Sequence, residues 1–371
     1  MKRWLRRVLR IAVAAFGLVL ILILAEVLIG WQCDLQGHID SPVAQPGERK
    51  VATSEIKNYG RPEDDTFLSY PEWYIVWSYQ EKADFQQHHL PSSFPYFGAV
   101  RQYWGSYCCI SRLIRDKYPF NSGEQVMLVV IGSSFSAEFI LKGAYEKTIG
   151  RFSEWTSRNN PTEEDQFANQ VARAYADFVH VRPFYEFHFA RQVNGLWSGT
   201  HLWGPHPVRK WERKVFLTAD YTIEAFYCWL IEKMTHLTYG SEPSDTYAWI
   251  DNASPALLAG MSRVKPVRQV GPKSYIVDLQ RYQEFTATAS DLAGQGVRFV
   301  EIAGNSQISV SALVPLAWRY GGLDAQQLFS SPLLTNPQTQ RVVIRTDVTS
   351  LHTLLNTLHR SGLTVEHVYD Y

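Results

Sequence analysis

Residues 1–31 read MKRWLRRVLRIAVAAFGLVLILILAEVLIGW, and this stretch decides how the chain is organised. Five cations and no acid precede Ile11, and residues 11–25 carry no charge. At a helical rise of about 1.5 Å per residue, residues 11–31 span roughly 30 Å, which is the thickness of the hydrocarbon layer of a bilayer. We therefore expect a cytoplasmic stub and transmembrane anchor over residues 1–31, with Trp4 and Trp31 at the two membrane interfaces.

Two features favour a retained anchor over a cleaved signal peptide. The apolar stretch reaches or exceeds the upper limit of about 15 residues for the core of a signal peptide. Residues 26–33 also lack the small-x-small pattern of a cleavage site. Because cations flanking a membrane helix stay in the cytoplasm, we expect a single-pass protein of a bacterial inner membrane, with a cytoplasmic N-terminus and the bulk of the chain outside.

The composition of the remainder is that of a globular protein. Without residues 1–30 the chain has 31 cations and 35 acids, so it lacks the basic excess of a nucleic-acid-binding protein. Aromatic residues make up 14% of the chain. They fit either an aromatic-rich core or a body that lies against the bilayer or binds an apolar ligand. The expected partners are membrane lipid and other envelope proteins, with no nucleic acid; the oligomeric state stays open.

After a Pro- and Gly-punctuated linker over residues 32–66, residues 67–255 have the pattern of an aromatic-rich helical domain. We expect helices after Ser69 and over about 96–117, 123–157, 162–179 and 208–238, with Thr162 as a helix cap. Within the third of these helices, residues 125–141 are a candidate second membrane segment. Its serines and Glu138 would be costly against lipid, so a buried bundle helix is the alternative.

A second pattern begins after a linker over residues 256–272. We expect strands over 275–279, 297–303, 308–316, 341–347 and 363–369, helices over 281–294 and 350–360, and an insertion over 323–338. Residues 304–306 have the composition of a hairpin turn. The order β-α-β-β-(insertion)-β-α-β over residues 273–371 resembles the ferredoxin-like α/β sandwich. The fold class expected for the whole chain is thus α+β: a transmembrane anchor, a helical domain and a C-terminal ferredoxin-like domain.

The cysteines give no metal or redox motif. Cys33, Cys108, Cys109 and Cys228 contain no C-x-x-C spacing. Disulfides are possible if the body is exported, but four cysteines allow three full pairings and the sequence does not choose between them. Buried thiols are the simpler interpretation.

The densest group of candidate site residues lies between residues 177 and 206. Asp177 and His180 are three residues apart, which places them on one face of a helix, and a carboxylate-oriented histidine can act in acid–base chemistry or bind a metal. Glu186 and His188 complete the candidate catalytic group. The candidate metal ligands are His180, His188, His201 and His206. No H-E-x-x-H motif, glycine-rich nucleotide motif or nucleophile elbow accompanies them, and no cofactor is identified.

A basic run follows at the start of the last expected helix: Arg209, Lys210, Trp211, Arg213 and Lys214. It fits either contact with lipid headgroups or a solvated helix face.

Together these patterns favour a membrane-anchored binding or interaction protein that acts at the membrane surface. This expectation rests on the many aromatic residues, on the expected anchor and on the absence of a reactive motif. The alternative is a membrane-tethered enzyme that uses the His/carboxylate cluster, with or without a metal, on an apolar or lipid-like substrate. A third candidate role is assembly, with the ferredoxin-like domain pairing to a second copy.

Overall fold

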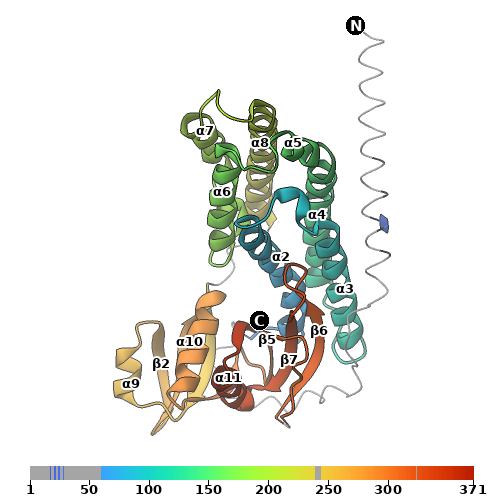
Figure 1. Cartoon of the computed structure of the whole chain (residues 1–371). Helices are drawn as coiled ribbons and strands as arrows, with labels where there is room; N and C mark the ends of the chain where they lie inside the picture. Colours follow the sequence, from blue (N-terminus) through green and yellow to red (C-terminus); the bar gives the residue numbers. More distant parts are fainter. Residues whose placement is uncertain are drawn as a thin grey trace. The chain divides into compact units, whose positions relative to one another are not determined.

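A computed structural model describes residues 60–238, 244–322 and 324–371, together with helical positions 17, 21, 24, 25 and 28 (Figure 1). The expected anchor, with Trp4 and Trp31, and most of the first linker lie outside the described residues. The described chain is α+β, with long helices followed by two antiparallel sheets. It divides into two compact units, whose described parts are residues 72–105 with 129–238, and residues 60–71 with 106–128 and 244–371.

Long helices dominate the first unit. They are α2 (Asp65–Gln86), α3 (Tyr96–Ile114), α4 (Ser122–Tyr145), α5 (Arg151–Thr156), α6 (Glu163–Val179), α7 (Phe189–Gly199) and α8 (Pro207–Thr238), and the first three cross the boundary between the units. Figure 1 shows α6, α7 and α8 packed together. Their shared core contains Val171, Leu196, Leu217 and Tyr221.

The predicted helices are present with small differences at their ends. Thr162 precedes α6 as expected, and its backbone N–H donates to Asp165 Oδ2 at 2.9 Å in a capping box. The first helix differs more, because α2 begins at Asp65 and carries Pro71 inside it rather than at its start. Pro71 lies in the second turn, so it has no backbone N–H to donate to the carbonyl oxygen of Phe67, four residues earlier.

Helix α4, a π-helical turn (η3, Glu146–Gly150) and α5 form one helical run, Ser122–Thr156. Within the described chain, this run is the one helix long and apolar enough to cross a membrane by length and composition. In the structure 39% of its most apolar window is buried. Serines Ser133 and Ser134 are half-buried and Ser136 is fully buried, where its Oγ accepts from Trp104 Nε1 at 2.9 Å. The three serines in the middle of this run are therefore at least partly covered by protein.

The second unit contains two four-stranded antiparallel sheets. The first has the order β2-β3-β1-β4 and the second β6-β7-β5-β8. The strands are β1 (Asp245–Asp251), β2 (Val264–Gly271), β3 (Ser274–Gln280), β4 (Arg298–Ile302), β5 (Gln307–Pro315), β6 (Ala325–Pro332), β7 (Thr339–Asp347) and β8 (Thr364–Tyr369). Three helices accompany them: α9 (Pro255–Gly260), α10 (Gln283–Gly294) and α11 (Leu351–Arg360).

The two sheets share one connection pattern. In each, the first strand lies between the third and the fourth, and the second strand pairs with the third. A helix precedes the last strand in both sheets. In the first sheet, α9 connects the first two strands, β1 and β2, whereas no helix is assigned among the described residues between β5 and β6 in the second. One hydrophobic core joins α10, α11 and the inner faces of both sheets. The unit is therefore an internal repeat whose second copy lacks the first helix.

This arrangement corrects the strand prediction. All five expected strands are present, as β3, β4, β5, β7 and β8, but they belong to two sheets instead of one. β1, α9 and β2 occupy residues expected to be helix or linker. Residues 304–306 join the two sheets and form no hairpin, because β4 and β5 lie in different sheets and only Ile302 and Asn305 bridge the connection.

Residues 60–71, which include the start of α2, are part of the second unit. Thr66 Oγ1 donates to Tyr369 O at 2.9 Å and accepts from the backbone N–H of Ser309 at 2.9 Å. Tyr70 packs edge-on against Phe329, with ring centroids 5.1 Å apart. Residues 60–66, expected as the end of a linker, are thus bound to β5 and β8.

Candidate functional site

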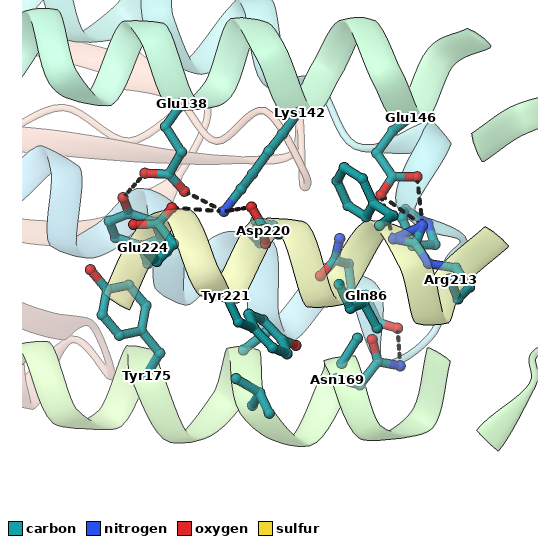
Figure 2. Close-up of a pocket in the computed structure, with 18 of the residues that line it drawn as sticks. Gln86, Glu138, Lys142, Glu146, Asn169, Tyr175, Arg213, Asp220, Tyr221 and Glu224 are labelled. Atoms are coloured by element: carbon teal, nitrogen blue, oxygen red, sulfur yellow. Dashed lines mark hydrogen bonds and ion pairs between the residues drawn. The ribbon is translucent and has the colours of Figure 1, made fainter. Parts of the chain in front are cut away.

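A group of charged side chains in the helical unit surrounds the ammonium of Lys142. Glu138 and Lys142 on α4 and Glu146 at the start of η3 are spaced four residues apart, so they lie on one face of the helical run. Asp220 and Glu224 lie four residues apart on α8 and face them. Figure 2 shows α4 and α8 side by side, with the labelled side chains of α4 directed toward α8.

Lys142 is shared by three carboxylates. Its Nζ lies 2.8 Å from Glu138 Oε1, 3.1 Å from Asp220 Oδ1 and 3.2 Å from Glu224 Oε1. The side chains of all four residues are only 14–17% exposed. Charges this far from water are costly unless they are paired, so one cation among three acids is an unusual local excess of negative charge.

Tyrosines close this cluster on one side. Tyr79 on α2 donates its hydroxyl proton to Glu138 Oε2 in a very short hydrogen bond. Burial and the charge of Glu138 raise the pKa of Tyr79 well above its usual value, so it remains a donor. Tyr175 on α6 packs edge-on against Tyr79, with ring centroids 4.9 Å apart.

Lys82 on α2 is a second cation at this site, and it forms no ion pair with any carboxylate of the described chain. Its ammonium lies 5.9 Å from the centroid of the Phe139 ring. Burial and the neighbouring Lys142 lower the pKa of Lys82.

A second ion pair lies further along the same two helices. Glu146 and Arg213 bind each other through three contacts of 2.8–3.0 Å, and both are almost fully buried. Glu146 begins the π-helical turn, a feature that is often found at functional sites. At Gly150, which ends the turn, a Cβ atom would lie 2.4 Å from Glu146 Oε2. Glycine here leaves room for the carboxylate to face Arg213.

These groups line a partly open cavity of about 70 Å³. At roughly 10–15 Å³ for one water, it has room for a few waters or one small ion but not for a lipid or a metabolite of ordinary size. The tyrosines Tyr79, Tyr96, Tyr175 and Tyr221 supply much of its aromatic wall. Its charged lining consists of four carboxylates (Glu138, Glu146, Asp220, Glu224) and three cations (Lys82, Lys142, Arg213).

The basic run at the start of α8 corrects both sequence interpretations. Arg209, Lys210, Arg213 and Lys214 are at most 2% exposed, so they neither contact headgroups nor form a solvated face. Trp211 is half-buried and lies edge-on to Trp203.

Acidic side chains of α6 are partners of Arg209 and Lys210. Arg209 Nη2 lies 2.7 Å from Asp165 Oδ1, and Lys210 Nζ lies 3.0 Å from Glu164 Oε1 and 2.9 Å from Glu163 Oε2. Hydrogen bonds from Lys210 and His201 lower the pKa of Glu163 to about 2. A short basic run flanked by apolar residues can thus form the buried face of a helix. Composition alone does not reveal this burial.

The predicted catalytic pair is not formed. Asp177 points outward and lies 3.5 Å from Arg173 Nε, whereas His180 Nδ1 lies 2.7 Å from the carbonyl oxygen of Ala176. The ring of His180 packs against Trp73 and Trp77. His180 therefore has a structural environment in the described unit.

The other candidate residues lie apart from one another. Glu186 lies 3.7 Å from Arg182, His188 precedes α7, and the exposed His201 lies 3.0 Å from Glu163. His206 has a positive φ of 58° at the turn before α8. Among the described residues no three His, Cys, Asp or Glu side chains are placed to hold a metal ion. Cys109 and Cys228 are buried thiols, whereas Cys108 is disulfide-bonded.

The sequence contains one pattern that indicates the charged residues of the cavity. Glu138, Lys142 and Glu146 repeat at i, i+4 in an otherwise apolar helix, and Asp220 and Glu224 repeat at the same interval in α8. Such spacing places charges on one face, but only the antiparallel pairing of α4 with α8 brings the two sets together. Lys82, from a third helix, has no comparable signal.

Comparison with known proteins gives no relative from which a function could be transferred. No protein-family model matches the chain, and neither a curated protein nor a solved structure matches it.

Proposed function

We propose that this chain is a membrane-anchored binding protein, and that the cavity between α2, α4, α6 and α8 binds one small monovalent cation of the ammonium type. The observation that carries the proposal is the sharing of Lys142 by three carboxylates within 3.2 Å, beside the cavity.

The charge of the cavity favours a cation over an anion. Its lining has one carboxylate more than it has cations, and Arg213 and Glu146 already compensate each other. With every lining group ionised, one further positive charge would neutralise the cavity. Burial and the charge of Glu138 raise the pKa of Glu224 to about 7, so a bound cation would compete with a proton at this carboxylate. Carboxylates and tyrosine rings are also the groups that attract an ammonium ion, and the volume of about 70 Å³ restricts the ligand to a few heavy atoms.

The membrane location rests on the anchor expected over residues 1–31 and on the apolar run Ser122–Thr156. Bacterial inner-membrane insertion with the body outside the cytoplasm is the orientation favoured by the N-terminal cations. The disulfide at Cys108 supports it, because disulfides persist in oxidising compartments.

For the second unit we propose an interaction role at the membrane surface. Its first sheet has the element order β-α-β-β-α-β and the strand order β2-β3-β1-β4, which resembles the ferredoxin-like split βαβ plan, and its second sheet repeats that order without the first helix. This plan serves many binding and regulatory modules, so the assignment of a role is by analogy of fold. Membrane lipid and other envelope proteins are the partner classes that we propose.

The enzyme alternative has less support, because its residues are spread over separate contacts. Neither His180 nor His188 lies in the cavity lining.

Thermal unfolding of the purified full chain in detergent tests cation binding. Ammonium, methylammonium, sodium and potassium chlorides would each replace N-methylglucamine chloride, whose cation is too large for the cavity, at constant ionic strength. A ligand at ten times its Kd stabilises the folded state by about 1.4 kcal/mol, or roughly 3–6 °C for a unit of this size.

We expect ammonium or methylammonium to give this shift in the wild-type chain. Glu224→Gln should abolish it, because the variant removes the excess negative charge. Glu186→Gln is the matched control, since its side chain is 45% exposed and lies outside the cavity. If none of the four cations shifts the transition, a proton balances the excess charge and the proposal of cation binding is wrong.

A further inference from the structure

The helix α8 has the reverse of the usual distribution of polar and apolar residues. Between Val208 and Leu230 it contains seven charged residues, and in this fully described stretch none of them is exposed. Its exposed residues are uncharged, and the large ones among them are Val208, Val215, Ile223, Phe226, Trp229 and Leu230. Ile223 and Phe226 are 67% and 62% exposed.

This exposed face is continuous and long. Val215, Ala219, Thr222, Phe226 and Trp229 follow one another at intervals of three or four residues, which keeps them on one side of a helix. From Val208 to Leu230 the face extends roughly 33 Å at about 1.5 Å per residue, close to the thickness of the hydrocarbon layer of a bilayer.

Both ends of the face resemble the borders of a membrane. Trp203 precedes α8 and is 75% exposed, and Trp229 lies at the far end, as expected for tryptophans in membrane interfaces. Exposed charges return immediately afterwards, at Glu232 and Lys233. In water, such a surface would be an unusually large exposed apolar patch.

Neighbouring helices make the contrast clear. Along α4, Glu138 and Lys142 are turned inward, while Val130 and Leu141 are more than half exposed. Helix α6 has the ordinary pattern of a helix in water, because it exposes Gln166, Gln170 and Asp177.

We infer that the outward face of α8 lies against the acyl chains of a lipid bilayer. The inference rests on the membrane location proposed above and adds a second contact that is separate from the expected anchor; it does not depend on cation binding. Average hydropathy does not detect α8, because the seven inward charges count as much as the outward apolar residues. The inward charges of α8 pair with charged residues of other helices in the unit. The helix can therefore contact lipid without exposing an unpaired charge to it.

Site-directed spin labelling of the full chain in nanodiscs of phosphatidylcholine and phosphatidylglycerol tests this contact. Labels on Ile223→Cys and Phe226→Cys would be compared with a label on Ala174→Cys, an exposed position of α6. Val215→Cys repeats the measurement if either α8 variant fails to fold. The wild-type chain, treated with the same reagent, gives the background from its own cysteines.

We expect the α8 labels to collide with molecular oxygen, which concentrates in lipid, and to be protected from a water-soluble nickel chelate. The label on α6 should show the opposite preference. Access of the nickel chelate to the α8 labels would overturn the inference, as would protection from both reagents, which would indicate a second copy or another segment of this chain on the face. A chain that does not enter nanodiscs at all would refute the proposed membrane location as well.

Discussion

Replacement of Lys142 by methionine should destabilise the helical unit strongly. Its ammonium is the cation that compensates Glu138, Asp220 and Glu224, each within 3.2 Å. Methionine has a similar length and no charge, so the variant leaves three mutually repelling carboxylates in a space largely shielded from water. Removal of one partner from a buried ion pair typically costs about 3–5 kcal/mol.

The loss should appear as a lower melting temperature of the full chain in detergent. At roughly 2–4 °C for each kcal/mol, the expected decrease is between about 6 and 20 °C. The decrease should shrink as the pH falls, because protonation of the crowded carboxylates in the variant relieves their repulsion. Double replacement of Lys142 with methionine and Asp220 with asparagine should recover part of the loss, because it removes one of the repelling charges.

Lys147→Met is the matched control, because Lys147 belongs to the same helical run and is exposed. Exposed substitutions usually change stability by no more than about 0.5 kcal/mol. If Lys142→Met unfolds within about 1 kcal/mol of the wild-type chain from pH 5 to pH 8, the three carboxylates do not depend on Lys142 and the reasoning is refuted.

Three further predictions concern the membrane face, helix packing and pH. In nanodiscs, Ile223→Asp should cost about 2.5–3.5 kcal/mol in thermal unfolding, the penalty for an acid in lipid, whereas a change below about 0.5 kcal/mol would place Ile223 in water. Gly132→Ala should cost about 1–3 kcal/mol, because the added Cβ would lie 2.1 Å from Cε1 of the buried Tyr103, and an unchanged melting temperature would contradict the close packing of α3 on α4. Burial raises the pKa of Asp370 to about 6 from an ordinary 3.8, so the folded chain binds this proton more tightly than the unfolded chain does. Its contribution to stability is full below about pH 4 and is lost as the pH rises through 6, up to about 3 kcal/mol. Denaturant unfolding of Asp370→Asn should therefore vary less between pH 4 and pH 7 than that of the wild-type chain, and a curve parallel to that of the exposed control Asp291→Asn would contradict the assignment.

Periodic apolar spacing and capping residues allowed the helices to be predicted. The 3–4 spacing of α6 and the Thr162 cap correspond to features of the structure, and so does the long helix after Pro207. The strands that were missed have a physical explanation. β2 exposes five of its eight residues, and β6 contains two glutamines and two serines, so neither shows an alternating apolar pattern. Both are edge strands of their sheets. β1 was missed as well, although it is a central strand with alternating burial; it begins and ends with aspartate, a residue that is depleted in strands.

The candidate site was harder to predict than the fold. Histidines and acids close together in sequence, such as Asp177 and His180, suggested chemistry, but a separation of three residues does not ensure contact when Arg173 competes for the carboxylate. The cavity depends instead on Glu138 and Glu224, which are far apart in sequence and meet only through the pairing of helices. In a sequence, a buried charged residue is indicated only by its position within an apolar run. Its partners are determined by the tertiary structure.

The measurement that tests the central claim most directly is the stoichiometry of methylammonium binding to the full chain in detergent. Equilibrium dialysis with radiolabelled methylammonium, at fixed pH and ionic strength, should give one bound cation per chain. Glu224→Gln should give none, and Glu186→Gln should bind as the wild-type chain does. Equal binding to the wild-type chain and Glu224→Gln, or no saturable binding to either, would contradict a cation site in the cavity.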